Sequence, residues 1–88
     1  AKLGLSVRPL TSQELAQVQI KQGLLVEEVG KGPAANAGIQ PGDVILAVNG
    51  DQVTSITQLQ EKLLPNSKNI ALLVMRGDSR IYVPVKMS

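Results

Sequence analysis

The 88-residue chain contains no cysteine, no histidine, no tryptophan and no phenylalanine, and its single aromatic residue is Tyr82. Without cysteine it can form no disulfide and offers no thiolate for catalysis or for zinc. Without histidine it lacks the side chain that most often serves as a general base and as a metal ligand. These absences exclude a cysteine nucleophile, a Ser-His-Asp triad and a zinc site built on sulfur and imidazole.

The chain also lacks a dense run of one charge and a long apolar run. Its nine basic and seven acidic residues are scattered and give a formal net charge of +2. A protein that binds single-stranded nucleic acid needs a basic groove with aromatic stacking platforms, so we expect no nucleic-acid partner. No apolar stretch approaches the roughly 20 residues that span a bilayer, so we expect no membrane insertion of these residues.

The acidic residues form no catalytic pattern. Asp43, Asp51 and Asp78 each lie beside a glycine, where aspartate commonly hydrogen-bonds the backbone of a turn. Glu27 and Glu28 are adjacent on a predicted strand, so their side chains are expected to point to opposite faces. A Ser–Lys dyad is the one catalytic alternative that the composition leaves open. We therefore predict a non-catalytic domain with no cofactor and no metal site.

Length and composition indicate a single globular domain over residues 1–88. Hydrophobic residues make up 43% of the chain and charged residues 18%, as in ordered globular domains. A chain of this size buries about 60 to 70% of the surface that its unfolded form exposes, which is enough for one modest core. A strand-like pattern begins with the first residues, so we expect the chain to be one domain of a longer protein.

Apolar periodicity and turn residues predict six strands, two helices and one further helical turn. The strands are expected over residues 3–8, 24–29, 44–48, 52–53, 69–76 and 79–86, the helices over 12–18 and 56–64, and the helical turn over 34–37. Thr11 and Glu14 fit a capping box, and Asn49-Gly50 and Gly77-Asp78 predict two-residue hairpin loops. These elements predict an α+β, mainly β fold, a small and partly open β-barrel of about six strands capped by two helices.

The most specific stretch of the chain covers residues 32–46, with the sequence GPAANAGIQPGDVIL. Its small alanines let a helical turn lie close to a sheet, Gly38 can end that turn in the left-handed conformation, and Pro41-Gly42 is a tight-turn pair. The run after Asp43 is apolar on both faces, as in a central strand. This order of helical turn, glycine, Pro-Gly-Asp and buried strand resembles the signature of PDZ domains, in particular those of bacterial HtrA-type (DegP/DegQ-like) proteases.

The resemblance covers nearly the whole chain and implies a site for the C-terminus of a peptide. In HtrA-type PDZ domains the binding strand lies near the N-terminus, after a loop whose backbone amides hold the terminal carboxylate. Convergent N–H groups in a glycine loop form an anion nest, and a free strand edge accepts an extended peptide. The implied peptide-binding residues are Lys2, Leu3, Gly4 and Leu5 in the loop, Ser6, Val7 and Arg8 on the strand, Ile56 and Gln60 on the helix wall, and Leu63 and Leu64 at the floor.

The same resemblance implies a preference for particular ligand ends. A histidine at the position of Ile56 favours serine or threonine two residues before the ligand's end, and isoleucine cannot make that hydrogen bond. We therefore predict an apolar side chain at that ligand position and a small or medium aliphatic last residue. An acidic ligand residue near Arg8 or Lys62 would add little, because exposed ion pairs are weak. Without the resemblance, the same apolar positions also fit an ordinary core, and Gly4 fits a plain bulge.

Two functions follow for such a domain. In the first, it captures hydrophobic C-termini of substrate proteins and delivers them to, or regulates, a linked serine protease in periplasmic protein quality control. In the second, it is an assembly module that docks onto neighbouring subunits of the protease oligomer through an apolar patch, for example at Leu10, Ile20 or Met87, and its peptide site is weak or occluded. Residues 76–88 resemble the end of a DegP/DegQ-like chain, which implies the second of two PDZ modules. A PDZ domain of another envelope protein is the remaining alternative, and the isolated domain is expected to be a monomer.

Overall fold

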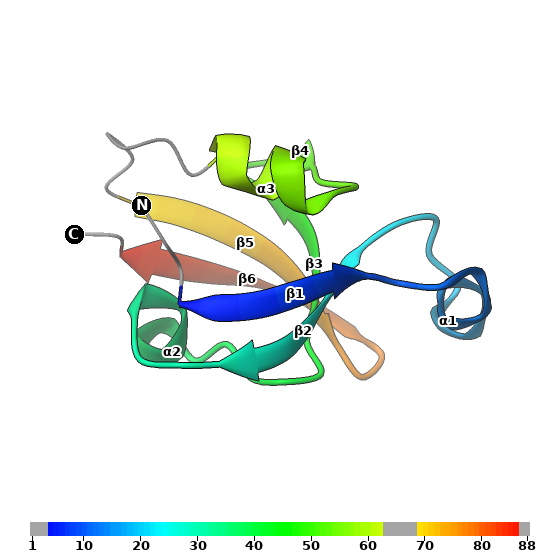
Figure 1. Ribbon diagram of the computed structural model, residues 1–88, viewed down its shortest axis with the longest axis horizontal. Helices are drawn as coiled ribbons and strands as arrows, with labels where there is room; N and C mark the ends of the chain where they lie inside the picture. Colours follow the sequence, from blue (N-terminus) through cyan, green and yellow to red (C-terminus); the bar gives the residue numbers. More distant parts are fainter. Residues whose placement is uncertain (1–3, 63–68, 87–88) are drawn as a thin grey trace.

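The computed structural model describes residues 4–62 and 69–86. Its elements follow in the order β1 (Leu5–Pro9), α1 (Ser12–Val18), β2 (Leu24–Val29), α2 (Pro33–Ala37), β3 (Val44–Val48), β4 (Asp51–Gln52), α3 (Ile56–Lys62), β5 (Asn69–Arg76) and β6 (Ser79–Lys86) (Figure 1). The predicted element set is confirmed, and α2 is the predicted helical turn. The returning strand β4 lies one residue earlier than expected. Asp51 and Gln52 pair with β3, and Val53, which follows them, is fully buried and still donates its N–H to the carbonyl of Leu46. The predicted starts and ends at Leu3 and Leu64 lie outside the described residues.

The six strands form one antiparallel sheet in the order β1-β2-β3-β5-β6, with β4 paired to β3. The sheet does not close on itself, so the expected partly open architecture is confirmed. Within the described residues β1 pairs only with β2, and β6 pairs only with β5. Helix α2 lies against β6, and α3 lies close to β1 (Figure 1). The edge of β1 that faces away from β2 is therefore an unpaired strand edge.

The hydrophobic core lies on the face of the sheet that α2 and α3 cover. Ala34 of α2 and Leu59 of α3 are buried against it. The strands contribute the other buried members, which are Leu24, Val26, Ile45, Val48, Ile70, Leu72, Val74, Val83 and Val85, together with Ile39 and Val53 from loops. Helix α1 contributes no buried residue and projects from the body of the domain at the end of β1 (Figure 1). Its attachment must therefore depend on polar contacts more than on core packing.

A β-bulge interrupts the ladder between β1 and β2. Ser6 pairs with Glu28 and Val7 pairs with Val26, so Glu27 is an extra residue on β2. The strict alternation expected for the two glutamates does not hold at this point, and both side chains are exposed. Because the extra residue is on β2, the alternation of β1 itself is intact, and successive residues of β1 direct their backbone N–H and C=O groups to opposite edges.

The central stretch packs around a buried carboxylate. Gly38 ends α2 with a φ of 95°, and Asp43 is only 2% exposed. One carboxylate oxygen of Asp43 accepts a hydrogen bond from the backbone N–H of Gln40 at 3.0 Å, which confirms the turn role predicted for it. Arg76 donates two further bonds to the same carboxylate, at 2.9 and 2.6 Å, and a third to the carbonyl of Gly38. A residue at the end of β5 thus anchors the turn that opens β3.

Candidate peptide-binding site

The candidate site lies between the unpaired edge of β1 and helix α3, and we call it the β1–α3 site. Leu59 of α3 is buried in the core, whereas Ile56, three residues before it, is 39% exposed. Gln60 lies one turn after Ile56 on the same side of the helix and is also exposed. On the strand, Leu5 and Val7 are half-buried and pack against the core. The two elements therefore bring an open strand edge close to a helix that exposes an apolar side chain.

The hydrogen bonds at the two ends of β1 show which backbone groups face this open edge. The carbonyl of Gly4 accepts a hydrogen bond from the N–H of Gly30 at 2.8 Å, and the N–H of Leu10 donates one to the carbonyl of Gly23 at 3.3 Å. All described peptide bonds are trans, so the C=O and N–H of one peptide unit point in opposite directions. The N–H of Leu5 and the C=O of Pro9 therefore point away from β2. Strand alternation then directs both backbone groups of Leu5 and Val7 to the open edge.

Gly4 holds the start of this strand in a conformation that other residues rarely adopt. Its φ is +82°, and a Cβ at this position would lie 2.8 Å from the carbonyl oxygen of Lys31. Gly4 therefore packs directly on the backbone of the loop between β2 and α2. This close contact fixes the position of the Leu5 N–H, one of the backbone donors of the predicted carboxylate nest.

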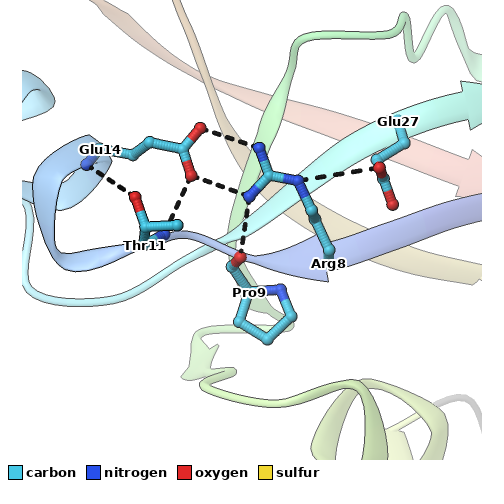
Figure 2. Close-up of polar contacts among 5 residues, drawn as sticks. All are labelled: Arg8, Pro9, Thr11, Glu14 and Glu27. Carbon is cyan, nitrogen blue, oxygen red and sulfur yellow. Dashed lines mark hydrogen bonds and ion pairs between the residues drawn. The ribbon is translucent and has the colours of Figure 1, made fainter.

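Arg8 ties the far end of β1 to helix α1 (Figure 2). Its guanidinium donates to both carboxylate oxygens of Glu14, at 2.8 and 2.9 Å, and its Nε lies 3.7 Å from a carboxylate oxygen of Glu27. It also donates to the carbonyl of Pro9 at 3.1 Å. Glu14 accepts from the backbone N–H of Thr11 and completes the predicted capping box. Glu14 therefore caps α1 and also restricts the conformation of the Arg8 side chain.

The contacts of Arg8 and Lys62 bear on the expected weak preference for acidic ligand residues. The guanidinium of Arg8 already faces two carboxylates of its own chain. The ammonium of Lys62 lies 3.1 Å from a carboxylate oxygen of Asp51. An acidic ligand side chain would have to compete with these partners, so the expected contribution is smaller still.

The pKa of Glu14 is lowered to about 2. The hydrogen bond from Arg8 is the largest cause, and the hydrogen bond from the backbone N–H of Thr11 is the next largest. A carboxylate whose pKa falls on folding stabilises the folded state above its ordinary pKa of 4.5, and this contribution is lost as the pH falls toward 2. We predict that an NMR pH titration of the Glu14 side chain shows a midpoint near 2, which rises toward the ordinary value in Arg8→Met. Glu27→Gln leaves the Arg8–Glu14 bonds intact and should leave the midpoint unchanged. A midpoint near 4.5 in the unaltered domain would contradict the ion pair.

A sequence profile of the PDZ domain family matches residues 25–76. The chain belongs to the PDZ domain family. It is 38% identical over 88 residues to a probable periplasmic serine endoprotease DegP-like of Hahella chejuensis, an alignment that covers 98% of this chain and 19% of that protein. It is 41% identical over 78 residues to the periplasmic pH-dependent serine endoprotease DegQ of Escherichia coli, covering 84% of this chain and 17% of DegQ. This PDZ domain thus spans about a fifth of the length of these relatives.

Solved structures of HtrA proteins superpose on this domain over nearly its whole length. The PDZ domain of HtrA3 bound to a phage-derived ligand, FGRWV, has a TM-score of 0.84 and 29% identity, and covers 97% of this chain and 82% of that chain. The HtrA-type protease AlgW with a tripeptide has a TM-score of 0.84 and 24% identity, and covers 97% of this chain and 30% of that chain. The likeness to AlgW shows the shared fold alone.

The predicted site residues of this PDZ domain fall into two groups. The structure places Gly4, which directly precedes β1, and the β1 residues Leu5, Ser6, Val7 and Arg8 on one side, and Ile56 and Gln60 of the neighbouring helix α3 on the other. Lys2, Leu3, Leu63 and Leu64 lie outside the described residues, so their predicted roles stay predictions.

The contacts of Glu14 and Pro9 with Arg8 are not predicted by the sequence patterns. The Thr11–Glu14 capping box was the one available signal, since it places a carboxylate just beyond the strand. Within residues 4–62 and 69–86, no cluster of three or more potential ligands could hold a metal ion, and no helix is long and apolar enough to cross a membrane.

Proposed function

We propose that this PDZ domain binds the free C-terminus of an extended peptide, which adds as a strand to the open edge of β1 beside α3. The unpaired edge carries this proposal, because the backbone groups of Leu5 and Val7 point away from β2 and toward the side where α3 lies. An added strand satisfies these groups by main-chain hydrogen bonds, which give affinity independent of side chains. The solved structure of the HtrA3 PDZ domain, which is 29% identical to this chain, contains a bound phage-derived ligand, FGRWV, and this supports peptide binding as the function here.

The orientation of the ligand follows from the position of the loop before β1. With its carboxylate at the amides around Gly4 and Leu5, the ligand must run antiparallel to β1. Its last residue then lies beside Leu5, and the third residue from its end lies beside Val7 and opposite Ile56. We propose a small or medium aliphatic last residue and an apolar residue two places before it. The HtrA3 ligand FGRWV also ends in valine.

The test is a fluorescence-anisotropy titration with short peptides that end in valine, leucine or isoleucine, each with a free or an amidated C-terminus. Free peptides should bind with micromolar affinity, about −8 kcal/mol, and amidation should weaken binding at least about tenfold, because it removes the charge that the loop amides hold. Equal binding of both forms would show that the carboxylate is not recognised. No binding of either form at millimolar protein would overturn peptide capture.

The exposed side chain of Ile56 gives a prediction for specificity. Ile56→Ala should weaken binding of a peptide with leucine two residues before its end by about three- to tenfold, because it removes most of an apolar contact. Since Ile56 is 39% exposed, the midpoint of thermal unfolding should change little. Glu61→Ala on the same helix is the control and should leave the affinity unchanged. Equal affinity of Ile56→Ala and the parent for this peptide would remove Ile56 from the site.

We further propose that the domain is the second PDZ module of a periplasmic serine endoprotease of the DegP/DegQ type. There it would hold the apolar C-termini of substrate proteins and deliver them to the protease domain, or regulate that domain. The DegP-like and DegQ relatives support this setting. The catalytic residues would lie in the rest of the protein. In the full-length protease, a substrate with a free apolar C-terminus should be degraded faster than the same substrate with an amidated end.

The assembly function is the second candidate, and one observation favours it. A hollow of about 320 Å³ lies away from the β1–α3 site and includes Ile20, one of the residues that the sequence suggested for docking. Leu46 and Leu73 supply apolar lining from β3 and β5, and Lys21 and Arg80 contribute charge. Light scattering of the full-length protease distinguishes assembly from peptide capture alone. If this hollow is an assembly contact, Ile20→Asp should lower the mass of the oligomer; an unchanged mass would exclude the hollow as an assembly contact.

A further inference from the structure

We propose that Pro9 and Arg8 end the ligand-pairing edge of β1 after Val7, so that this PDZ domain pairs with the backbone of only the last three residues of a bound C-terminus. The inference rests on the proposed function, because it specifies how much of the ligand the β1–α3 site can pair with. It follows from the direction of backbone groups along β1 and from one side-chain contact.

The register of an added strand is set by the outward-facing residues of β1. Leu5, Val7 and Pro9 are the alternate residues of β1 whose backbone groups point away from β2. In an antiparallel ladder, each such residue faces every second residue of the partner strand. Leu5 would pair with the last residue of the ligand and Val7 with the third residue from its end. The fifth residue from the end would face Pro9.

Pro9 offers this fifth ligand residue no free backbone group. Proline has no N–H, so it cannot donate to the ligand's carbonyl. Its own carbonyl points toward the open edge and already accepts a hydrogen bond from Nη1 of Arg8 at 3.1 Å (Figure 2). A ligand N–H that approached the second lone pair of this oxygen would bring its positive end next to the guanidinium charge, which opposes the approach.

The guanidinium of Arg8 is held in place by two carboxylates. Two hydrogen bonds from Arg8 to Glu14 fix its plane, and the carboxylate of Glu27 lies on the other side of the side chain (Figure 2). Glu14 is itself fixed, because it accepts from the N–H of Thr11. Bidentate pairs of this kind set geometry as well as charge. Arg8 is therefore a positioning residue that closes the upstream end of the binding edge.

The experiment removes single ligand N–H groups and leaves the ligand's shape nearly unchanged. Acetylated seven-residue peptides ending in valine are made with one amide N–H replaced by an ester oxygen, at the third or at the fifth residue from the end. Their affinities are measured by displacement of a labelled peptide. The ester at the third residue should weaken binding about tenfold, and the ester at the fifth should change it less than about twofold.

Variants of the domain then test the role of Arg8. In Arg8→Met the carbonyl of Pro9 becomes free, so the all-amide peptide should bind about three- to tenfold more tightly than the peptide with an ester at the fifth residue. Glu27→Gln keeps the Arg8–Pro9 contact, and it should behave as the unaltered domain does. Thermal unfolding of each variant checks that it is folded at the temperature of the titration.

Each failure has its own signature. If the ester at the third residue leaves the affinity unchanged, strand addition to β1 does not occur and the proposed function fails. If that ester weakens binding and the ester at the fifth residue weakens it equally in the unaltered domain, the proposed function holds and the early end of the edge is wrong. If Arg8→Met stays indifferent to the ester at the fifth residue, Arg8 does not close the edge.

Discussion

Replacing Gly4 with alanine should weaken the binding of a free C-terminal peptide at least about tenfold. The φ of Gly4 is +82°, where a residue with a Cβ loses about 1 to 2 kcal/mol. The new Cβ would also lie 2.8 Å from the carbonyl oxygen of Lys31. That oxygen belongs to the backbone and cannot rotate away, so the backbone at Gly4 must move. This movement displaces the N–H of Leu5, on which the proposed carboxylate nest depends.

Gly50→Ala is the matched control for this variant. Gly50 has a φ of +87°, close to that of Gly4, and a Cβ there would meet no atom within 4 Å. It therefore reproduces the backbone strain without the contact, and it lies in the β3–β4 turn, outside the β1–α3 site. Gly50→Ala should lower the free energy of unfolding by about 1 kcal/mol and Gly4→Ala by about 2 to 3 kcal/mol, while only Gly4→Ala should affect peptide binding. Equal affinities of the two variants would contradict the role of the loop.

The elements of this fold were predictable because their signals are local. The Thr11–Glu14 capping box, the Asn49-Gly50 turn and the small-residue stretch at 32–46 each specify a structure within a few residues. The α1 cap and the hairpin loops accordingly lie where the sequence places them. Strand β1 could likewise be identified as an edge candidate once the resemblance to PDZ domains placed the ligand there.

The features that escaped prediction depend on pairing between distant segments. Arg76 meets Asp43 across 33 residues of sequence, and no local pattern in the chain relates them. The bulge at Glu27 arises from the register between β1 and β2, which two separate strand patterns do not determine. The contact of Arg8 with the Pro9 carbonyl requires the side chain to be turned back by Glu14. Each of these features needs a known register before a residue's neighbours can be named.

The buried carboxylate of Asp43 gives the largest expected effect on stability. Asp43→Ala should lower the free energy of unfolding by about 2 to 4 kcal/mol, because it removes a buried acceptor from the Gln40 N–H and from two donors of Arg76. For a domain of this size that corresponds to a fall of about 10 to 25 °C in the midpoint of thermal unfolding. Asp51→Ala is the control: Asp51 is also an aspartate after a turn glycine, but its pair with Lys62 is exposed, so about 0 to 1 kcal/mol is expected.

The pH dependence of this effect separates the charge of Asp43 from its packing. Burial alone would raise the pKa of Asp43, but the Arg76 hydrogen bonds, the Gln40 N–H and the Arg76 charge together lower it below the ordinary value of 3.8. The stabilisation from the ionised carboxylate is therefore complete above that ordinary value and is lost as the pH falls through the lowered pKa. The difference in unfolding free energy between the parent and Asp43→Ala should be constant from pH 6 to 8 and should shrink in strong acid. A difference that stays the same in strong acid would mean that Asp43 stabilises the turn through its shape and not through its charge.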